Sequence, residues 1–273
     1  MRWHICSVAL GAVLLSSTSP AAPTLAQESP INIVYEEPTN ATLRPLYERL
    51  KTQRVLEELQ AFLMPLRLPR QLTVRTAQCG APKLPYRSGE PVTVCYELID
   101  QVEQIITAHT TDQNEQRSHI VGAFIEIVLH ETASGIFDIL QIPVWGREED
   151  ASDRLAALIM SQFGEDVMFT TIVGTAELFL WSNRQWSGAD FASTASPEAQ
   201  RFYNYLCVAY ASDPFRYAYL VRNGILPARR ADRCEGEYAQ IRKAFDLRIM
   251  PYVDPDLLVR ARATPWLTWS VER

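Results

Sequence analysis

The chain has 273 residues, of which 47% are hydrophobic, and a formal net charge of −6 at pH 7. This apolar share supports a folded core and excludes disorder over most of the chain. The excess of acidic residues argues against a protein that binds nucleic acid or an anionic membrane surface.

The first 26 residues have the layout of a secretory signal peptide. Arg2 precedes a mostly apolar run from Ile5 to Leu15, and small residues follow it up to Ala26. The run is too short for a permanent membrane helix, and no later stretch is expected to span a membrane. We therefore predict cleavage after Ala26, export to the periplasm or the extracellular space, and a single domain over residues 27–273 with its core at about 70–250.

Four cysteines follow the predicted cleavage point: Cys79, Cys95, Cys207 and Cys234. An even number in an exported chain predicts two disulfides. Of the three possible pairings we favour Cys79–Cys95 and Cys207–Cys234, because each pair flanks a turn-rich connection. A thiolate metal site is the alternative, but no C-x-x-C spacing supports it.

The first hundred residues predict a mixture of strands and helices. Leu43–Leu63 contains two leucine stripes with helical spacing, rotated apart, so that a bend or a second helix is expected between them. The two β-like stretches further along are expected to form a hairpin closed by Cys79–Cys95. The predicted strands are Ile31–Tyr35, Gln71–Thr76 and Pro91–Tyr96; a helix is expected over Glu97–Thr107 and a loop over Thr110–Arg117.

The remainder of the chain is expected to be mainly helical. Ser118–Leu140 is apolar nearly all round, which is typical of a buried helix. A turn containing Pro143 and Gly146 leads into a second helix, Glu148–Phe163, which we expect to return antiparallel to the first as a helix hairpin. Later helices are predicted over Asp166–Leu180, from Ser196 as a capping residue, and over Cys234–Met250, with a loop over Trp181–Ala195. The predicted fold class is α+β, mainly helical.

The buried helix contains His130 and Glu131, and a charged residue there has to be paired, neutralised or bound to a metal. Zinc peptidases with the pattern H-E-x-x-H place two histidine ligands one helical turn apart and use the glutamate as general base. The fifth position in this chain is Ser134, and a hydroxyl is a poor zinc ligand beside an imidazole. The motif is therefore incomplete.

The following helix carries two further candidates, Glu149 and Asp153. In one large class of zinc peptidases a glutamate on the next helix is the third ligand, and an aspartate one turn later orients a ligand histidine. Glu126, one turn before His130, could bond the imidazole or supply a substitute oxygen. The plainer interpretation is that His130 is an ordinary core residue and that the acids only stabilise a helix start.

Beyond the H-E dipeptide the chain resembles a family of secreted bacterial metallopeptidases defined by a domain of unknown function. The family pattern H-E-L-G-H-A-x-x-D-x-x-x-I-P-V-x-G-R-E-E-D-A-A-D matches from His130 through Asp138 and Ile142 to Asp153. The likeness extends from about Leu72 to Asp246 and includes the segment Arg201–Cys207.

The resemblance implies a zincin-like core with His130 and Glu149 as zinc ligands, Glu131 as general base and Asp153 as support. This chain departs from the pattern at Ser134 and Ala195, where the family has histidines, and at Ala133, where it has a glycine. We therefore expect an exported metallopeptidase-like protein with a degenerate zinc site, which binds zinc weakly or not at all and has weak or no activity on a peptide or protein substrate. The alternatives are an active metallohydrolase that uses Glu126 or Asp153 as substitute ligand, and a binding module that has no catalytic activity.

Overall fold

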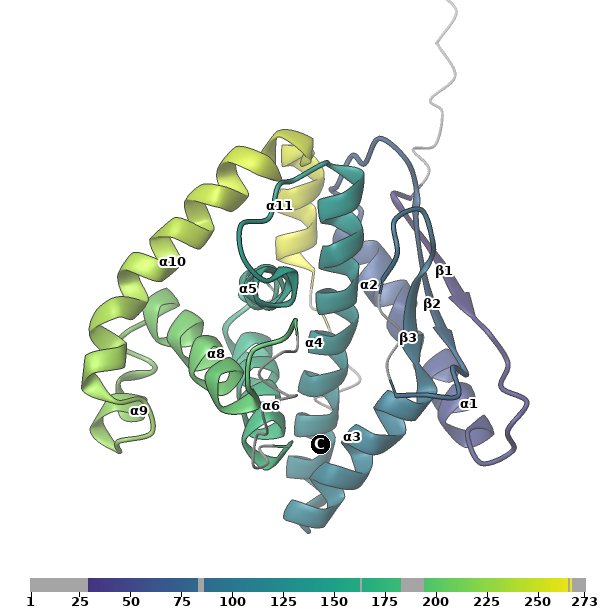
Figure 1. Ribbon diagram of the computed structural model, residues 1–273, viewed down its shortest axis with the longest axis horizontal. Helices are drawn as coiled ribbons and strands as arrows, with labels where there is room; N and C mark the ends of the chain where they lie inside the picture. Colours follow the sequence, from purple (N-terminus) through teal and green to yellow (C-terminus); the bar gives the residue numbers. More distant parts are fainter. Residues whose placement is uncertain (1–28, 83–85, 163, 183–193, 265, 267–273) are drawn as a thin grey trace, which may run out of the picture.

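The computed structural model describes residues 29–82, 86–162, 164–182, 194–264 and 266. The predicted signal peptide and most of the predicted loop after Trp181 lie outside these residues. The described chain is mainly helical with one small sheet, consistent with the predicted α+β class (Figure 1). The strands are β1 (Ile31–Tyr35), β2 (Leu72–Ala77) and β3 (Val92–Cys95), and the helices are α1 (Arg44–Thr52), α2 (Val55–Leu63), α3 (Tyr96–His109), α4 (Gln113–Ile139), α5 (Glu148–Met160), α6 (Glu165–Ser182), α8 (Glu198–Ser212), α9 (Ala218–Arg222), α10 (Ala228–Arg248), the 3-10 turn η1 (Met250–Tyr252) and α11 (Pro255–Ala263).

The three strands form a parallel sheet in the order β1-β2-β3, so the predicted hairpin is wrong. A connection between parallel strands needs about a dozen residues or more, and residues 78–91 are long enough to lead from the end of β2 back to the start of β3. The disulfide Cys79–Cys95 is present, and it joins equivalent ends of β2 and β3 because Ala77 is in register with Cys95.

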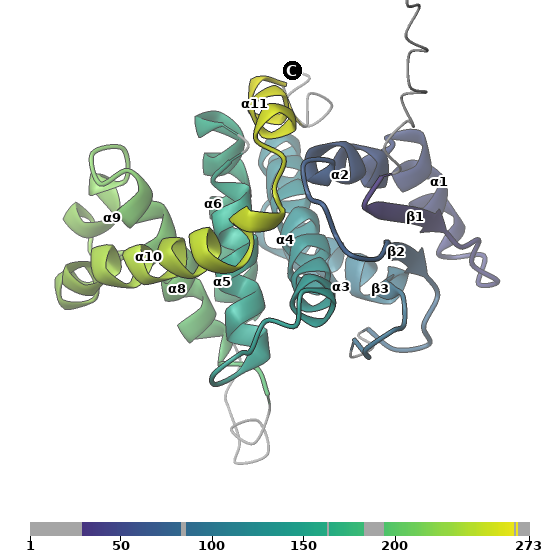
Figure 2. The ribbon, with the colours of Figure 1, turned by 90° about the horizontal axis from the view of Figure 1, so that it is seen from above.

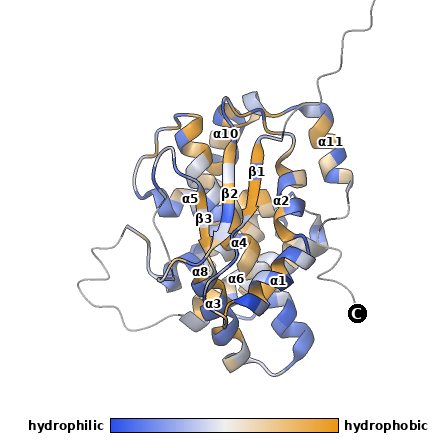
Figure 3. Ribbon diagram, turned by 90° about the vertical axis from the view of Figure 1, so that its right-hand side faces the viewer, coloured by the Kyte–Doolittle hydropathy of each residue, from blue (hydrophilic) through white to orange (hydrophobic). Residues whose placement is uncertain are grey.

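One face of the sheet covers the core. Alternate residues of β2 and β3 are buried, including Leu72, Val74 and Val92, as the two-residue period of a strand requires. Figure 3 shows β1 as hydrophobic along most of its length. Helix α4 approaches the sheet at Gly135, where an added Cβ would lie 2.8 Å from Leu72 Cδ1.

Helix α4 runs through the middle of the protein. It begins at Gln113, earlier than the predicted start, because the Asp112 carboxylate accepts hydrogen bonds from the backbone N–H groups of Asn114 and Glu115. The predicted loop over Thr110–Arg117 is therefore wrong in its second half. By length and composition α4 could cross a membrane, but 89% of its apolar window is buried within the protein, as in the core helix of a soluble protein.

Helices α4 and α6 approach each other through glycine. A Cβ added at Gly122 would lie 3.0 Å from the backbone oxygens of Thr170 and Thr171, and one added at Gly174 would lie 2.9 Å from His119 Cα. Such close contact of the two backbones brings α6 against the part of α4 that precedes His130.

Helix α5 crosses α4 instead of running back beside it. In Figure 1, α4 stands upright while α5 is seen nearly end-on. The expected antiparallel hairpin is therefore wrong in orientation, although the two helices do pack together. On the far side of α5, α8 packs against α6 and is joined to α10 by the second predicted disulfide, Cys207–Cys234.

Candidate metal site

The imidazole of His130 lies between two carboxylates of α5. Its Nδ1 is 2.8 Å from Asp153 Oδ1, and its Nε2 is 3.0 Å from Glu149 Oε2. Glu149 and Asp153 are one turn apart on α5, so both side chains point to the same face, which crosses α4 at His130. The structure thus brings together three of the residues that the sequence predicted to form the site.

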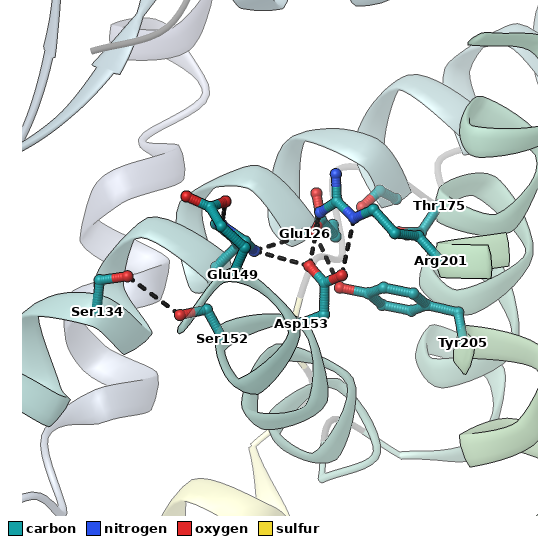
Figure 4. Close-up of polar contacts among 10 residues, drawn as sticks. Glu126, Ser134, Glu149, Ser152, Asp153, Thr175, Arg201 and Tyr205 are labelled. Atoms are coloured by element: carbon teal, nitrogen blue, oxygen red, sulfur yellow. Dashed lines mark hydrogen bonds and ion pairs between the residues drawn. The ribbon is translucent and has the colours of Figure 1, made fainter. Parts of the chain in front are cut away.

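A buried ion cluster surrounds the Nδ1 side of the ring. Arg201 of α8 donates to Asp153 from Nε at 2.8 Å and from Nη2 at 2.6 Å, and its Nη2 lies 3.3 Å from Glu126 Oε1. The Tyr205 hydroxyl donates to the same oxygen of Glu126 at 2.9 Å. Figure 4 shows Arg201 and Tyr205 reaching Asp153 and Glu126 from one side, with Glu149 on the other.

An aromatic side chain of α6 packs against the ion cluster. The guanidinium carbon of Arg201 lies 4.0 Å from the centre of the Phe179 ring. A cation on the face of an aromatic ring is stabilised by the quadrupole of the ring, and more so when water is excluded. Phe179 of α6 therefore stabilises Arg201, which in turn binds Asp153.

The charges of this cluster determine how its groups titrate. Burial lowers the pKa of His130, but the hydrogen bonds to Asp153 and Glu149 outweigh it and raise that pKa to about 9. Burial raises the pKa of Asp153, but the charge of Arg201 and the bond to His130 hold it well below its usual range. Burial keeps the pKa of Glu126 above its ordinary value. The geometry therefore favours an imidazolium that donates to both carboxylates.

The Nε2 side of His130 is the more open one. The Glu149 side chain there is 26% exposed, whereas those of His130 and Asp153 are almost fully buried. One turn along α4, Ser134 lines a pocket of about 490 Å³ that also contacts Phe137 and Asp138. The Ser134 hydroxyl lies 3.1 Å from that of the fully buried Ser152. The position of the missing histidine thus faces a hollow.

Glu131, the predicted general base, is buried on α4. It lies one turn before Gly135, so it is on the side of α4 that faces the sheet. Its role in any hydrolysis stays a prediction.

Each side of the His130 ring offers candidate ligands for a metal ion. The atoms of Glu126, His130 and Asp153 lie within 4.8 Å of one another, but the guanidinium of Arg201 already provides the cation at that point. On the other side, His130 Nε2 and Glu149 supply an imidazole and a carboxylate, ligands typical of zinc. Catalytic zinc sites use three protein ligands, and the Ser134 hydroxyl is a poor third. The donor set is therefore one ligand short.

The start of α8 differs from its prediction. Pro197 occupies the N-cap position, and the Ser196 hydroxyl instead donates to Asp150 Oδ2 at 2.9 Å, which ties it to α5. The backbone oxygen of Ala195 accepts a hydrogen bond from Arg147 at 3.1 Å. The position at which the family pattern has a histidine is thus joined to the beginning of the helix that carries Glu149.

Sequence reasoning did not assign Arg201 and Tyr205 of α8 to the His130 cluster. Arg201 precedes Tyr205 by one helical turn, and Tyr205 lies among the buried residues of this helix, so both point into the protein. An arginine on the apolar face of a helix needs a buried acid, and that signal was present in the sequence. Its partners could not be inferred, because Asp153 and Glu126 lie 48 and 75 residues away.

Comparison with known proteins places the chain in a family. The sequence model of a family described as "Putative metallopeptidase" matches residues 35–247, which is most of the chain. The chain belongs to this family. No curated protein and no solved structure matched the chain.

Proposed function

We propose that this protein is an exported member of the metallopeptidase family that retains half of a zinc site and has little or no peptidase activity. The observation that carries the proposal is the placement of His130 Nε2 beside Glu149, 3.0 Å away, while Nδ1 is held by Asp153. Once Nε2 gives up its proton, His130 is suited to be a metal ligand, because Asp153 keeps the Nδ1 proton in place and leaves Nε2 free to bind. Because Ser134 stands in place of the second histidine, we expect zinc to bind weakly.

Export is supported by the two disulfides, because disulfides persist in oxidising compartments. The peptide or protein ligand follows from the family alone. Because the donor set is one ligand short, we derive no hydrolytic step for the natural protein. When bound, zinc would lower the pKa of a water molecule and polarise a carbonyl, and Glu131 is our candidate for the base that accepts the proton.

An active hydrolase that uses Glu126 or Asp153 as the replacement ligand is less well supported. Both carboxylates lie toward Nδ1 of His130, on the other side of the ring from Glu149, and both contact Arg201. To bind zinc together with Nε2 they would have to leave a buried cation without its partners, which is costly.

The test is the zinc content of the purified protein after dialysis against a weak chelator, with Ser134→His and Ser134→Asn beside it. We expect far less than one zinc per chain in the natural protein and in Ser134→Asn, and nearly one in Ser134→His. Adding Glu149→Gln to Ser134→His should remove the metal again. Stoichiometric zinc in the natural protein would contradict the incomplete site, and zinc in none of the variants would mean that His130 and Glu149 are not ligands.

The role of Glu131 is tested separately. If Ser134→His gains hydrolysis of a peptide mixture, Glu131→Gln in that background should abolish hydrolysis and leave the zinc content unchanged. Equal hydrolysis rates with and without the Glu131 carboxylate would exclude it as the base.

A further inference from the structure

An apolar pocket of about 200 Å³ lies between α5 and α10, away from the His130 cluster. Figure 2 shows α10 crossing α5. The walls come from the last turn of α4, from the turn between α4 and α5, from α5 and from the end of α10. They include Phe137, Val144, Leu155, Leu158, Phe245 and Ile249.

Trp145 stands at this pocket with 95% of its surface exposed. An indole is the largest apolar side chain, and leaving it in water gives up the free energy that burial would provide. Exposed aromatic residues beside a pocket are typical of the residues that dominate binding interfaces. The side chain is therefore available to cover a ligand.

The charged residues of the pocket are both arginines. Arg154 of α5 and Arg248 of α10 line it, both are exposed, and neither forms an ion pair with another residue in the described part of the chain. The last two turns of α10 add Arg242 and Lys243 against a single acid, Asp246. The charged lining of the pocket is therefore basic, although the protein as a whole has an excess of acids.

The size of the pocket limits what it can bind. Ligand pockets for drug-sized molecules measure roughly 300–1,000 Å³, so a pocket of about 200 Å³ suits one large side chain. The carboxylate that pairs with the arginines has to lie close to that side chain. A free peptide C-terminus supplies both groups on one residue, and its two oxygens can accept from two guanidinium groups.

We propose that this pocket binds the C-terminal residue of a peptide or protein whose last residue is large and apolar. The aromatic or branched side chain fills the pocket beneath Trp145, and the terminal carboxylate pairs with Arg154 and Arg248. Phe137, Ile142, Pro143 and Val144 line both this pocket and the hollow at Ser134. A bound chain can therefore continue around this turn toward the candidate metal site, but the binding itself needs no metal.

The test uses fluorescein-labelled hexapeptides ending in Phe and measures anisotropy with the purified protein in the presence of a chelator. We expect saturable binding of the free acid and at least about tenfold weaker binding of the C-terminal amide and of a peptide ending in Gly. Trp145→Ala and Arg154→Ala/Arg248→Ala should each weaken binding by a similar factor.

Two variants serve as controls. Phe215→Ala removes another aromatic that is 94% exposed, and Arg229→Ala removes an exposed arginine at the other end of α10. Neither should change the dissociation constant. The proposal is overturned if the amide binds as well as the acid, if the pocket variants bind like the natural protein, or if octanoate competes as strongly as the peptide, which would indicate a fatty acid. Because zinc is absent throughout, the result is independent of the metal content of Ser134→His.

Discussion

One oxygen of Asp153 binds both Arg201 and His130: Oδ1 lies 2.6 Å from Arg201 Nη2 and 2.8 Å from His130 Nδ1. The orientation of the candidate metal ligand on α4 therefore depends on an arginine of α8 as well as on the aspartate of α5. Any change at Arg201 should affect both the stability of the fold and the state of the imidazole.

Replacement of Arg201 by Met should lower the free energy of unfolding by about 3–5 kcal/mol, because the buried carboxyl groups of Asp153 and Glu126 then share the charge of His130 alone. Urea denaturation followed by circular dichroism measures the change. Arg216→Met is the matched control, since its partner Glu165 has an 83% exposed side chain and such pairs contribute about 0–1 kcal/mol. Equal effects of the two variants would show that the buried cluster contributes no more to stability than an exposed ion pair.

Stability should depend on pH through His130. Its pKa rises from 6.5 in the unfolded chain to about 9 in the folded protein, so the folded state holds the proton more tightly. The resulting stabilisation, on the order of 3 kcal/mol, is fully present below pH 6.5 and is lost as pH rises through about 9. Denaturation midpoints measured across this range should fall steadily.

The control for this dependence is a second buried histidine. His119→Asn should retain the decline between pH 6.5 and 9, whereas His130→Asn should remove most of it. His119 also lies on α4, 2.6 Å from Glu177 of α6. The comparison therefore distinguishes an effect of the His130 cluster from a general effect of replacing a histidine in α4. A flat profile in the natural protein would mean that the imidazole is neutral in the folded state.

These relationships mark the limit of what the sequence could predict. The order of His130, Glu149 and Asp153 on two helices indicated that they meet, because helical spacing places residues one turn apart on one face. The angle between α4 and α5 could not be predicted, since it depends on how ridges of both helices interlock. The prediction that α5 runs antiparallel to α4 was therefore wrong, although the two helices do pack together.

The sheet shows a similar limit. Local patterns identified all three strands. The sequence of β2 and β3, with a disulfide across their connection, fits either a hairpin or a parallel pair. The disulfide Cys79–Cys95 did not decide between them, because it closes the connection in both arrangements. The decision lies in tertiary packing, where Leu72 and Val92 meet α4 at Gly135.

The second disulfide should be important for the position of α8, and hence of Arg201. Cys207→Ser/Cys234→Ser opens a connection with a sequence separation of 27 and should lower the free energy of unfolding by about 3–4 kcal/mol, mainly by freeing the unfolded chain. Denaturation of this variant and of the natural protein under oxidising conditions gives the difference. An effect below that of Cys79→Ser/Cys95→Ser, whose separation is 16, would contradict the loop-length argument.

The glycine contact between α4 and α6 gives a paired prediction. In Gly122→Ala the new methyl group would lie 3.0 Å from two backbone oxygens of α6, so the helices have to separate, at a cost of about 1–3 kcal/mol. Gly236→Ala on α10 meets nothing within 4 Å and should instead stabilise the protein by up to about 1 kcal/mol, because alanine favours the helix. Thermal denaturation of both variants measures these opposite signs. Helix α6 also carries Phe179, which packs on Arg201. Gly122→Ala should therefore also reduce the dependence of stability on pH that His130 causes. An unchanged dependence would show that the ion cluster keeps its geometry without close contact of α4 and α6.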